Sequence, residues 1–271
     1  MSSHIEIKFT DLLPEQFELL IAHLTEAGFE GFEENETELK AFIPEKNYDK
    51  ALLHELAYKY QLPFTEKIIP EQTWDEAWET GFQPVVVDDF VTIRADFHEP
   101  AKSTRHEIII TPKMSFGTGH HATTCMMVQH MRTIDFTGKK VLDFGAGTGI
   151  LAILAEKLGA GEITAIDHDD WSISNAAENI EKNQCRKIEL RKADSLPERQ
   201  QYDIILANIN KNVIAGNFAS FAANLIPGGV LLLSGLLADD EEEIKRLAAS
   251  FNMILSAKKE QSQWICLRLS C

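Results

Sequence analysis

The residues most able to do chemistry lie in a glycine-rich stretch near the middle of the chain. It runs from Val141 to Gly149 and reads Val-Leu-Asp-Phe-Gly-Ala-Gly-Thr-Gly. Glycines let the backbone turn sharply and let a ligand approach without Cβ atoms in the way. Here they alternate strictly, whereas a turn that binds a dinucleotide has the spacing Gly-x-Gly-x-x-Gly. The stretch therefore predicts a ligand site of a different kind from a dinucleotide pocket, with Gly145 and Gly147 against the ligand.

An acidic residue follows the next expected strand. Asp167 ends the apolar run that begins at Ile163. A carboxylate at this place accepts hydrogen bonds from two ribose hydroxyls and rejects a ribose 2′-phosphate. Capping of the next helix is a second role for Asp167, although Asp169 and Asp170 are better placed for it. The glycine spacing and this acid are together typical of class I methyltransferases, whose cofactor is S-adenosylmethionine.

Two polar residues follow the next two expected strands. Asp194 stands where an acid commonly accepts a hydrogen bond from the adenine amine, and a solvated loop carboxylate is the alternative. Asn208 ends the fourth strand, and the carboxyl ends of strands in an open α/β sheet face the active crevice. We therefore expect Asn208 to point to where the methyl group sits and to accept a hydrogen bond from an amine. A helix cap is its alternative role, for which Asn210 is the better candidate.

A second glycine-rich segment precedes the first. It reads Phe-Gly-Thr-Gly-His-His-Ala-Thr-Thr from Phe116 to Thr124. An aromatic residue in a glycine-rich loop that opens a helix suits a flap over a cofactor. We expect Phe116 to cover the ligand and the threonine hydroxyls to donate hydrogen bonds to it. His120 and His121 are adjacent and have no companions at zinc-ligand spacing, so we predict no metal site.

These residues need a parallel sheet to position them. From residue 139 onward, apolar strand-like runs alternate with helical stretches. That alternation predicts a parallel sheet with helices on both faces. We expect strands at 141–142, 163–166, 188–190, 204–207, 230–234 and 264–269, and helices at 150–158, 171–183, 213–225 and 241–251. The runs at 85–87, 90–93 and 107–110 are expected to form an antiparallel prelude to this sheet.

The first 70 residues predict a separate, smaller unit with the order β-α-β-β-α-β, a ferredoxin-like arrangement. The expected strands are 4–9, 29–33, 39–43 and 64–69; the expected helices start near Pro14, ending at Gly28, and span 48–60. We divide the chain into residues 1–70 for substrate recognition, a linker helix at 71–83 and a catalytic domain at 84–271. Trp74 and Trp78 of the linker are expected to pack between the domains.

Composition limits the classes of partner. The net charge of −16 and the absence of a basic run argue against direct contact with nucleic acid. The acidic surplus serves solubility or steers a basic protein partner, and both readings stay open. Apolar stretches are too short to cross a bilayer, and the N-terminus predicts a strand rather than a signal peptide. Four cysteines without a Cys-x-x-Cys spacing predict reduced thiols in the cytoplasm. We expect a monomer.

Three motifs in order give the chain a family resemblance. F-G-T-G-x-H-x-T-T, then D-x-G-x-G-x-G, then A-N-I are the marks of the bacterial ribosomal protein methyltransferases that act on protein eleven of the large subunit. The resemblance implies a class I, Rossmann-like α/β domain with a small N-terminal ferredoxin-like α+β domain. It implies transfer of methyl groups from S-adenosyl-L-methionine to amines of that ribosomal protein. The family residues that contact the cofactor fall on Thr124, Gly145, Asp167 and Asn208.

The chain departs from the family pattern at a few positions. His120 replaces the usual threonine, Ala122 the usual proline, and Asn210 a common apolar residue, and the N-terminal domain is divergent. Asn208 is expected to orient a neutral amine, and we nominate no general base. The alternatives are methylation of another protein lysine or of a small molecule, a nicotinamide-dependent dehydrogenase, whose glycine spacing is different, and a non-catalytic binding protein.

Overall fold

The computed structural model describes residues 4–35, 37–60, 62–69, 82–112, 119–196 and 200–271. The chain divides into two compact units, Met1–Gly81 and Phe82–Cys271. Most of the predicted linker, including Trp74 and Trp78, lies outside the described residues. Within the described part, no helix combines the length and the apolar character needed to span a membrane.

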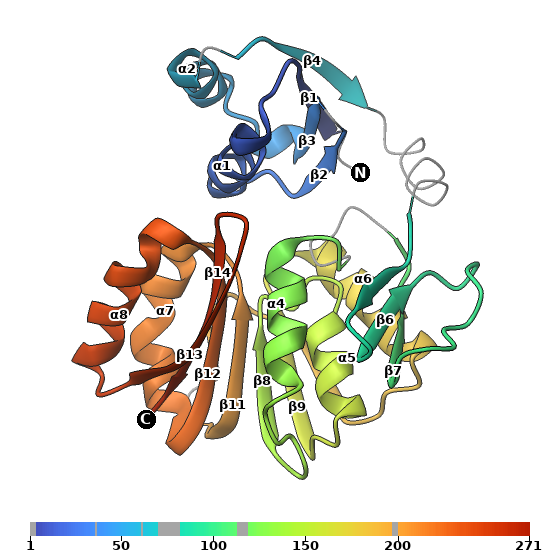
Figure 1. Cartoon of the computed structure of the whole chain (residues 1–271), viewed down its shortest axis with the longest axis vertical. Helices are drawn as coiled ribbons and strands as arrows, with labels where there is room; N and C mark the ends of the chain where they lie inside the picture. The colour runs from blue at the N-terminus through green and yellow to red at the C-terminus, as the bar shows by residue number, and fades with distance from the viewer. Residues whose placement is uncertain (1–3, 36, 61, 70–81, 113–118, 197–199) are drawn as a thin grey trace. The chain divides into compact units, whose positions relative to one another are not determined.

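The smaller unit has the ferredoxin-like topology that the sequence predicts. Its strands form an antiparallel sheet in the order β2-β3-β1-β4 (Figure 1). In β1 the alternate residues Ile5, Ile7 and Phe9 are buried, which is the two-residue period of a sheet covered on one face. The elements are β1 (His4–Phe9), α1 (Pro14–Glu26), β2 (Gly31–Glu34), β3 (Leu39–Pro44), η1 (Glu45–Asn47), α2 (Lys50–Tyr60) and β4 (Phe64–Ile69).

The larger unit is an α/β domain around a seven-stranded sheet with the order β10-β9-β8-β11-β12-β14-β13. Strands β8 to β12 are parallel, and β14 runs antiparallel to both of its neighbours. This is the predicted Rossmann-like arrangement. Its elements are β8 (Lys140–Phe144), α5 (Ile150–Lys157), β9 (Glu162–Asp167), α6 (Asp170–Lys182), β10 (Ile188–Lys192), β11 (Tyr202–Asn208), α7 (Lys211–Asn224), β12 (Leu225–Leu237), η3 (Ala238–Asp240), α8 (Glu241–Ser250), β13 (Ile254–Gln261) and β14 (Trp264–Ser270), preceded by α4 (Ala122–Met131).

Helices cover both faces of this sheet. Helices α7 and α8 pack on one face and form the hydrophobic core there, with Phe218 and Phe221 fully buried (Figure 1). Helix α4 covers the other face, where Met127 Sδ lies 3.5 Å from the Cys266 thiol of β14. The apolar positions of the central parallel strands β8, β11 and β12 therefore face helices on both sides, which explains their nearly continuous hydrophobic runs.

One expectation about the strands is wrong, and one strand was missed. The runs expected as an antiparallel prelude form β5 (Val85–Val87), β6 (Val91–Arg94) and β7 (His106–Ile109), a separate three-stranded sheet. Strands β6 and β7 are parallel, because the connection through residues 95–105 is long enough to return the chain to the same end. Strand β13 was not expected at all. It is an edge strand with lysines at 258 and 259, so its apolar signal is weak.

A close backbone contact sets the exit of β11. Gly235 follows Ser234, the partner of Asn208 in the β11–β12 pairing, and has a φ of +82°. A Cβ atom on Gly235 would collide with the carbonyl oxygen of Ile209. Ile209 N also donates to Ser234 O at 3.1 Å. Only glycine lets the backbone after β11 and the backbone of β12 approach this closely just after Asn208.

We expect Gly235→Ala to lower the free energy of unfolding by about 3 kcal/mol, since it adds a steric clash to the cost of a positive φ. Gly228→Ala is the matched control: its φ is +77° and no atom lies within 4 Å of the added Cβ. That variant should lose only about 1 kcal/mol. Urea unfolding of both variants measures the difference. Equal losses would show that the contact with Ile209 does not matter.

Candidate active site

The register of three neighbouring strands builds the site. Phe144 of β8 pairs with Ile166 of β9 on one side and with Ala207 of β11 on the other. The next residues along these strands are Gly145, Asp167 and Asn208. They therefore form a row at the carboxyl edge of the sheet, with the spacing between residues set by that between strands, roughly 4.8 Å.

The glycine-rich turn between β8 and α5 requires its glycines. Gly145, Gly147 and Gly149 all have positive φ, of +77°, +53° and +80°. The amides of Gly145 and Ala146 both donate to Ile166 O, at 2.8 and 2.9 Å, which fixes the start of the turn on β9. A Cβ atom on Gly145 would also collide with the Ile209 side chain. The turn is thus a bare backbone surface next to the end of β11.

Asp167 is tied to this turn. Its Oδ2 accepts a hydrogen bond from Gly147 N at 2.8 Å, and its Oδ1 accepts one from Asp169 N at 3.0 Å. A carboxylate offers about four acceptor positions, so two backbone bonds leave acceptor capacity for a ligand's hydroxyls. The alternative role of helix cap belongs to Asp169, whose carboxylate accepts from Ser172 N at 2.8 Å.

A second carboxyl group lies beneath the turn. Asp143 is 1% exposed, and its Oδ2 accepts from Ala152 N of α5 at 3.0 Å. Its Oδ1 has no hydrogen-bond partner among the described residues. Burial raises the pKa of the Asp143 carboxyl to about 7, and the nearby Asp167 adds to the rise. A cationic ligand would favour the ionised form here, because opposite charge offsets the cost of burial.

Asn208 and Thr124 meet on the other side of the row. Asn208 Nδ2 lies 3.4 Å from Thr124 Oγ1, and the two residues are 9% and 1% exposed. Asn208 Oδ1 is buried without a hydrogen-bond partner among the described residues. Burying an unpaired carbonyl oxygen is unfavourable, and a hydrogen-bond donor on a ligand at this edge would remove that cost. The alternative cap role belongs to Asn210, whose Oδ1 accepts from Val213 N at 3.0 Å.

The two histidines of the flap motif, His120 and His121, contact other parts of the protein. His121 is the N-cap of α4, and its ring accepts from Thr123 N at 3.3 Å. Burial lowers the pKa of His121 to about 4, so this ring is neutral near pH 7. The ring of His120 packs edge-on against Phe82, with centroids 4.9 Å apart. The described residues contain no group of side chains that could hold a metal ion.

Of the two remaining predicted site residues, Asp194 lies in the described structure and Phe116 does not. Asp194 is exposed, and the amide of the preceding Ala193 donates to Asp167 O at 2.9 Å, so this loop starts at the same edge of the sheet. Phe116 lies outside the described residues. Sequence reasoning missed Gly235 and the contact with Ile209. The signal was a glycine directly after the predicted strand 230–234, beside the strand that carries Asn208.

Comparison with known proteins agrees with this geometry. The family model described as ribosomal protein L11 methyltransferase (PrmA) matches residues 15–270. The ribosomal protein L11 methyltransferase of Porphyromonas gingivalis is 40% identical over 266 residues, 95% of this chain and 92% of that protein. The protein of the same name from Chlorobaculum parvum is 35% identical over 277 residues, 97% of this chain and 95% of that protein.

A solved structure is similar as well. The crystal structure of ribosomal protein L11 methylase from Lactobacillus delbrueckii subsp. bulgaricus matches with a TM-score of 0.65 and 26% identity. The match covers 70% of this chain and 98% of that one. Sequence and fold thus agree over nearly the whole length of the relatives. This chain therefore belongs to the ribosomal protein L11 methyltransferase family, whose members use S-adenosylmethionine.

Proposed function

We propose that this protein transfers methyl groups from S-adenosylmethionine to amines of ribosomal protein L11, on lysine side chains, the N-terminal amine or both. The observation that carries the proposal is the row of Gly145, Asp167 and Asn208 at one sheet edge. The target comes from the names of the relatives, which match along their length. The cytoplasmic location expected from the reduced cysteines belongs to the same proposal.

The residues at this edge fit the chemistry of the cofactor. Its methionine end carries an ammonium group, which suits the buried Asp143 carboxyl and the bare turn of Gly145 and Gly147. Its ribose carries two hydroxyls, which suit the remaining acceptor positions of Asp167. In our proposal Thr124 and Asn208 border the same site, Asp194 accepts from the adenine amine, and Phe116 covers the ligand.

S-adenosylmethionine, when bound, supplies a methyl group already activated on a sulfonium sulfur. The protein's task is then to bring a neutral amine into line and to exclude water. A free lysine amine has a pKa of about 10.4, and desolvation together with nearby positive charge lowers it. Asn208 Oδ1 would accept one N–H of the amine and so aim its lone pair. This oxygen orients the amine and is too weakly basic to remove its proton.

The smaller unit is proposed to hold the ribosomal protein. Residues 1–70 carry more acidic than basic side chains, and several of the acidic ones, such as Asp11, Glu26 and Asp49, are exposed. An acidic surface attracts a basic partner and accelerates its association, more strongly at low salt. In this division of labour, residues 71–83 connect the substrate unit to the catalytic domain of residues 84–271.

Asp167→Asn should raise the dissociation constant of S-adenosylhomocysteine by about 10- to 100-fold, because hydrogen bonds to a charged acceptor are worth about 1.5–3 kcal/mol. Asp169→Asn is the matched control: it removes the same charge two residues away, and asparagine remains a good helix N-cap. Isothermal titration calorimetry measures both. Similar weakening in the two variants would contradict the assignment of the ribose to Asp167.

Asn208→Ala should lower kcat by about 100-fold, since a misaligned nucleophile costs rate of this order. The affinity for S-adenosylhomocysteine should change much less. Asn212→Ala, which removes an exposed amide from the first turn of α7, is the control and should leave both quantities unchanged. Steady-state kinetics with the ribosomal protein and calorimetry with the cofactor product separate the effects. Equal losses of turnover and affinity would argue against an orienting role.

The substrate is tested with labelled S-adenosylmethionine and purified ribosomal protein L11. The proposal expects label on L11, incorporated about 100-fold more slowly by Asn208→Ala, and mass spectrometry then identifies the methylated amines. A ribosomal extract and a mixture of free lysine and small amines serve as competing substrates. Label that enters another protein or a small molecule while L11 stays unlabelled would contradict L11 as the substrate. It would not contradict the assignment of the S-adenosylmethionine site.

A further inference from the structure

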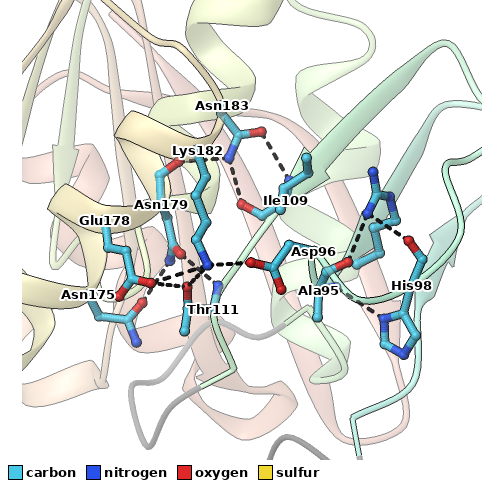
Figure 2. Close-up of polar contacts among 11 residues, drawn as sticks. Ala95, Asp96, His98, Ile109, Thr111, Asn175, Glu178, Asn179, Lys182 and Asn183 are labelled. Atoms are coloured by element: carbon cyan, nitrogen blue, oxygen red, sulfur yellow. Dashed lines mark hydrogen bonds and ion pairs between the residues drawn. The ribbon is translucent and has the colours of Figure 1, made fainter.

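One side of α6 carries three asparagines spaced four residues apart, Asn175, Asn179 and Asn183 (Figure 2). Residues at this spacing lie along one face of a helix. Asn175 and Asn179 are fully buried, and Asn183 is half-buried. Most buried side-chain amides are hydrogen-bonded, and here the amides of Asn179 and Asn183 find several partners, whereas Asn175 Nδ2 has none among the described residues.

Two of these amides pair with the edge of β7 that faces α6. Asn183 Oδ1 accepts from Ile109 N at 3.0 Å, and its Nδ2 donates to Ile109 O at 2.6 Å. Asn179 Oδ1 accepts from Thr111 N at 2.7 Å. A side-chain amide has the same kinds of donor and acceptor as a peptide group. These side chains therefore pair with backbone groups of β7 and the residues after it, as a neighbouring strand would. The residue between them, Ile110, donates to Arg94 O on the opposite side.

Asn179 makes an additional connection that Asn183 does not. Its Nδ2 donates to Thr148 O at 2.8 Å and to Asn175 Oδ1 at 2.7 Å. Thr148 lies inside the glycine-rich turn, between Gly147 and Gly149. One buried amide therefore joins the turn at the cofactor edge to the segment that follows β7, at Thr111, and all of its hydrogen-bonding groups are used.

Ion pairs and hydrogen bonds hold the Thr111 side chain in place. Lys182 Nζ lies 2.7 Å from Asp96 Oδ2 and 2.7 Å from Thr111 Oγ1, and the Thr111 hydroxyl donates to Glu178 Oε1 at 2.6 Å (Figure 2). Lys182 and Glu178 also form an ion pair at 3.2 Å. Thr111 is thus fixed through both its backbone amide and its side chain. These side-chain contacts add stability around Thr111, whereas the Asn179 bridge uses only the Thr111 backbone amide.

We propose that Asn179 is a positioning residue for the cofactor site, which holds the Thr148 carbonyl, and with it the glycine-rich turn, against the backbone at Thr111, just after β7. The inference rests on the proposed function, because it takes the turn as the place where the cofactor binds. Three glycines give this turn wide conformational freedom. A turn held in its binding conformation pays less ordering entropy on binding, so the bridge strengthens cofactor affinity.

The test compares Asn179→Ala with Asn183→Ala. Each substitution removes three side-chain hydrogen bonds from the same helix face: Thr111 N, Thr148 O and Asn175 Oδ1 for Asn179, and Ile109 N, Ile109 O and Asn179 O for Asn183. Both should therefore lower the unfolding midpoint. Only Asn179→Ala should raise the dissociation constant of S-adenosylhomocysteine, by about tenfold, with Asn183→Ala within about twofold of the wild type.

Two further variants keep the test decisive. Thr111→Val removes the hydroxyl contacts with Lys182 and Glu178 but keeps the backbone amide that Asn179 accepts from, so it should cost stability and leave affinity within about twofold. If Asn179→Ala does not fold, Asn179→Leu takes its place. Leucine has a similar branched shape, buries no charge and makes none of the bonds to Thr111 N, Thr148 O and Asn175 Oδ1, so we expect the same loss of affinity.

Kinetics with the methyl acceptor add a second readout. At saturating S-adenosylmethionine, Asn179→Ala should keep kcat within about threefold and raise the KM for the cofactor about tenfold. Equal losses of affinity in the Asn179 and Asn183 variants, or unchanged affinity in Asn179→Ala, would reduce Asn179 to a structural residue. A wild-type protein that binds no S-adenosylhomocysteine would instead overturn the proposed function itself, and this inference with it.

Discussion

The parallel register of β8, β9 and β11 is the constraint on which the rest of the structure depends. It brings Gly145, Asp167 and Asn208, which are far apart along the chain, to neighbouring positions at one edge of the sheet. A shift of one residue would turn each side chain to the other face of the sheet. Two covering helices and close-packed apolar residues make such a shift costly, so the core of the domain maintains the geometry of the site.

Several buried polar side chains lie at or next to the carboxyl edge of the sheet. Most of those near the site are satisfied by backbone groups, as in the bonds from Gly147 N to Asp167 and from Asn179 to Thr148 O. Asp143 Oδ1 and Asn208 Oδ1 differ, since neither has a partner among the described residues. Asp143 lies in β8, just before the glycine-rich turn, and Asn208 is the last residue of β11. An arrangement that leaves acceptors unpaired at this edge loses stability and gains capacity for a cationic, amine-bearing ligand.

Local patterns in the sequence predicted much of this arrangement. Hydrophobic runs and turn residues located the strands that carry the site, and the alternating glycines identified the turn between β8 and α5. The patterns failed where the decisive contacts are distant in sequence. Strands β6 and β7 pair in parallel through a long connection, and β13, which pairs with β14, contains two lysines in place of apolar residues. Hydrophobic periodicity locates β6 and β7 but does not give their relative direction, and β13 has a weak apolar signal because an edge strand buries few side chains.

The sequence by itself determined the type of each site residue and its place at the end of a strand, because strand period, glycine spacing and helix-cap preference act over a few neighbouring residues. Only the tertiary structure decided which of these residues meet. The collision that makes Gly235 necessary involves Ile209, and the asparagines of α6 find their partners in β7 and the glycine-rich turn. Such contacts depend on how separate elements pack. Packing is set by the whole core, and no local stretch of sequence encodes it.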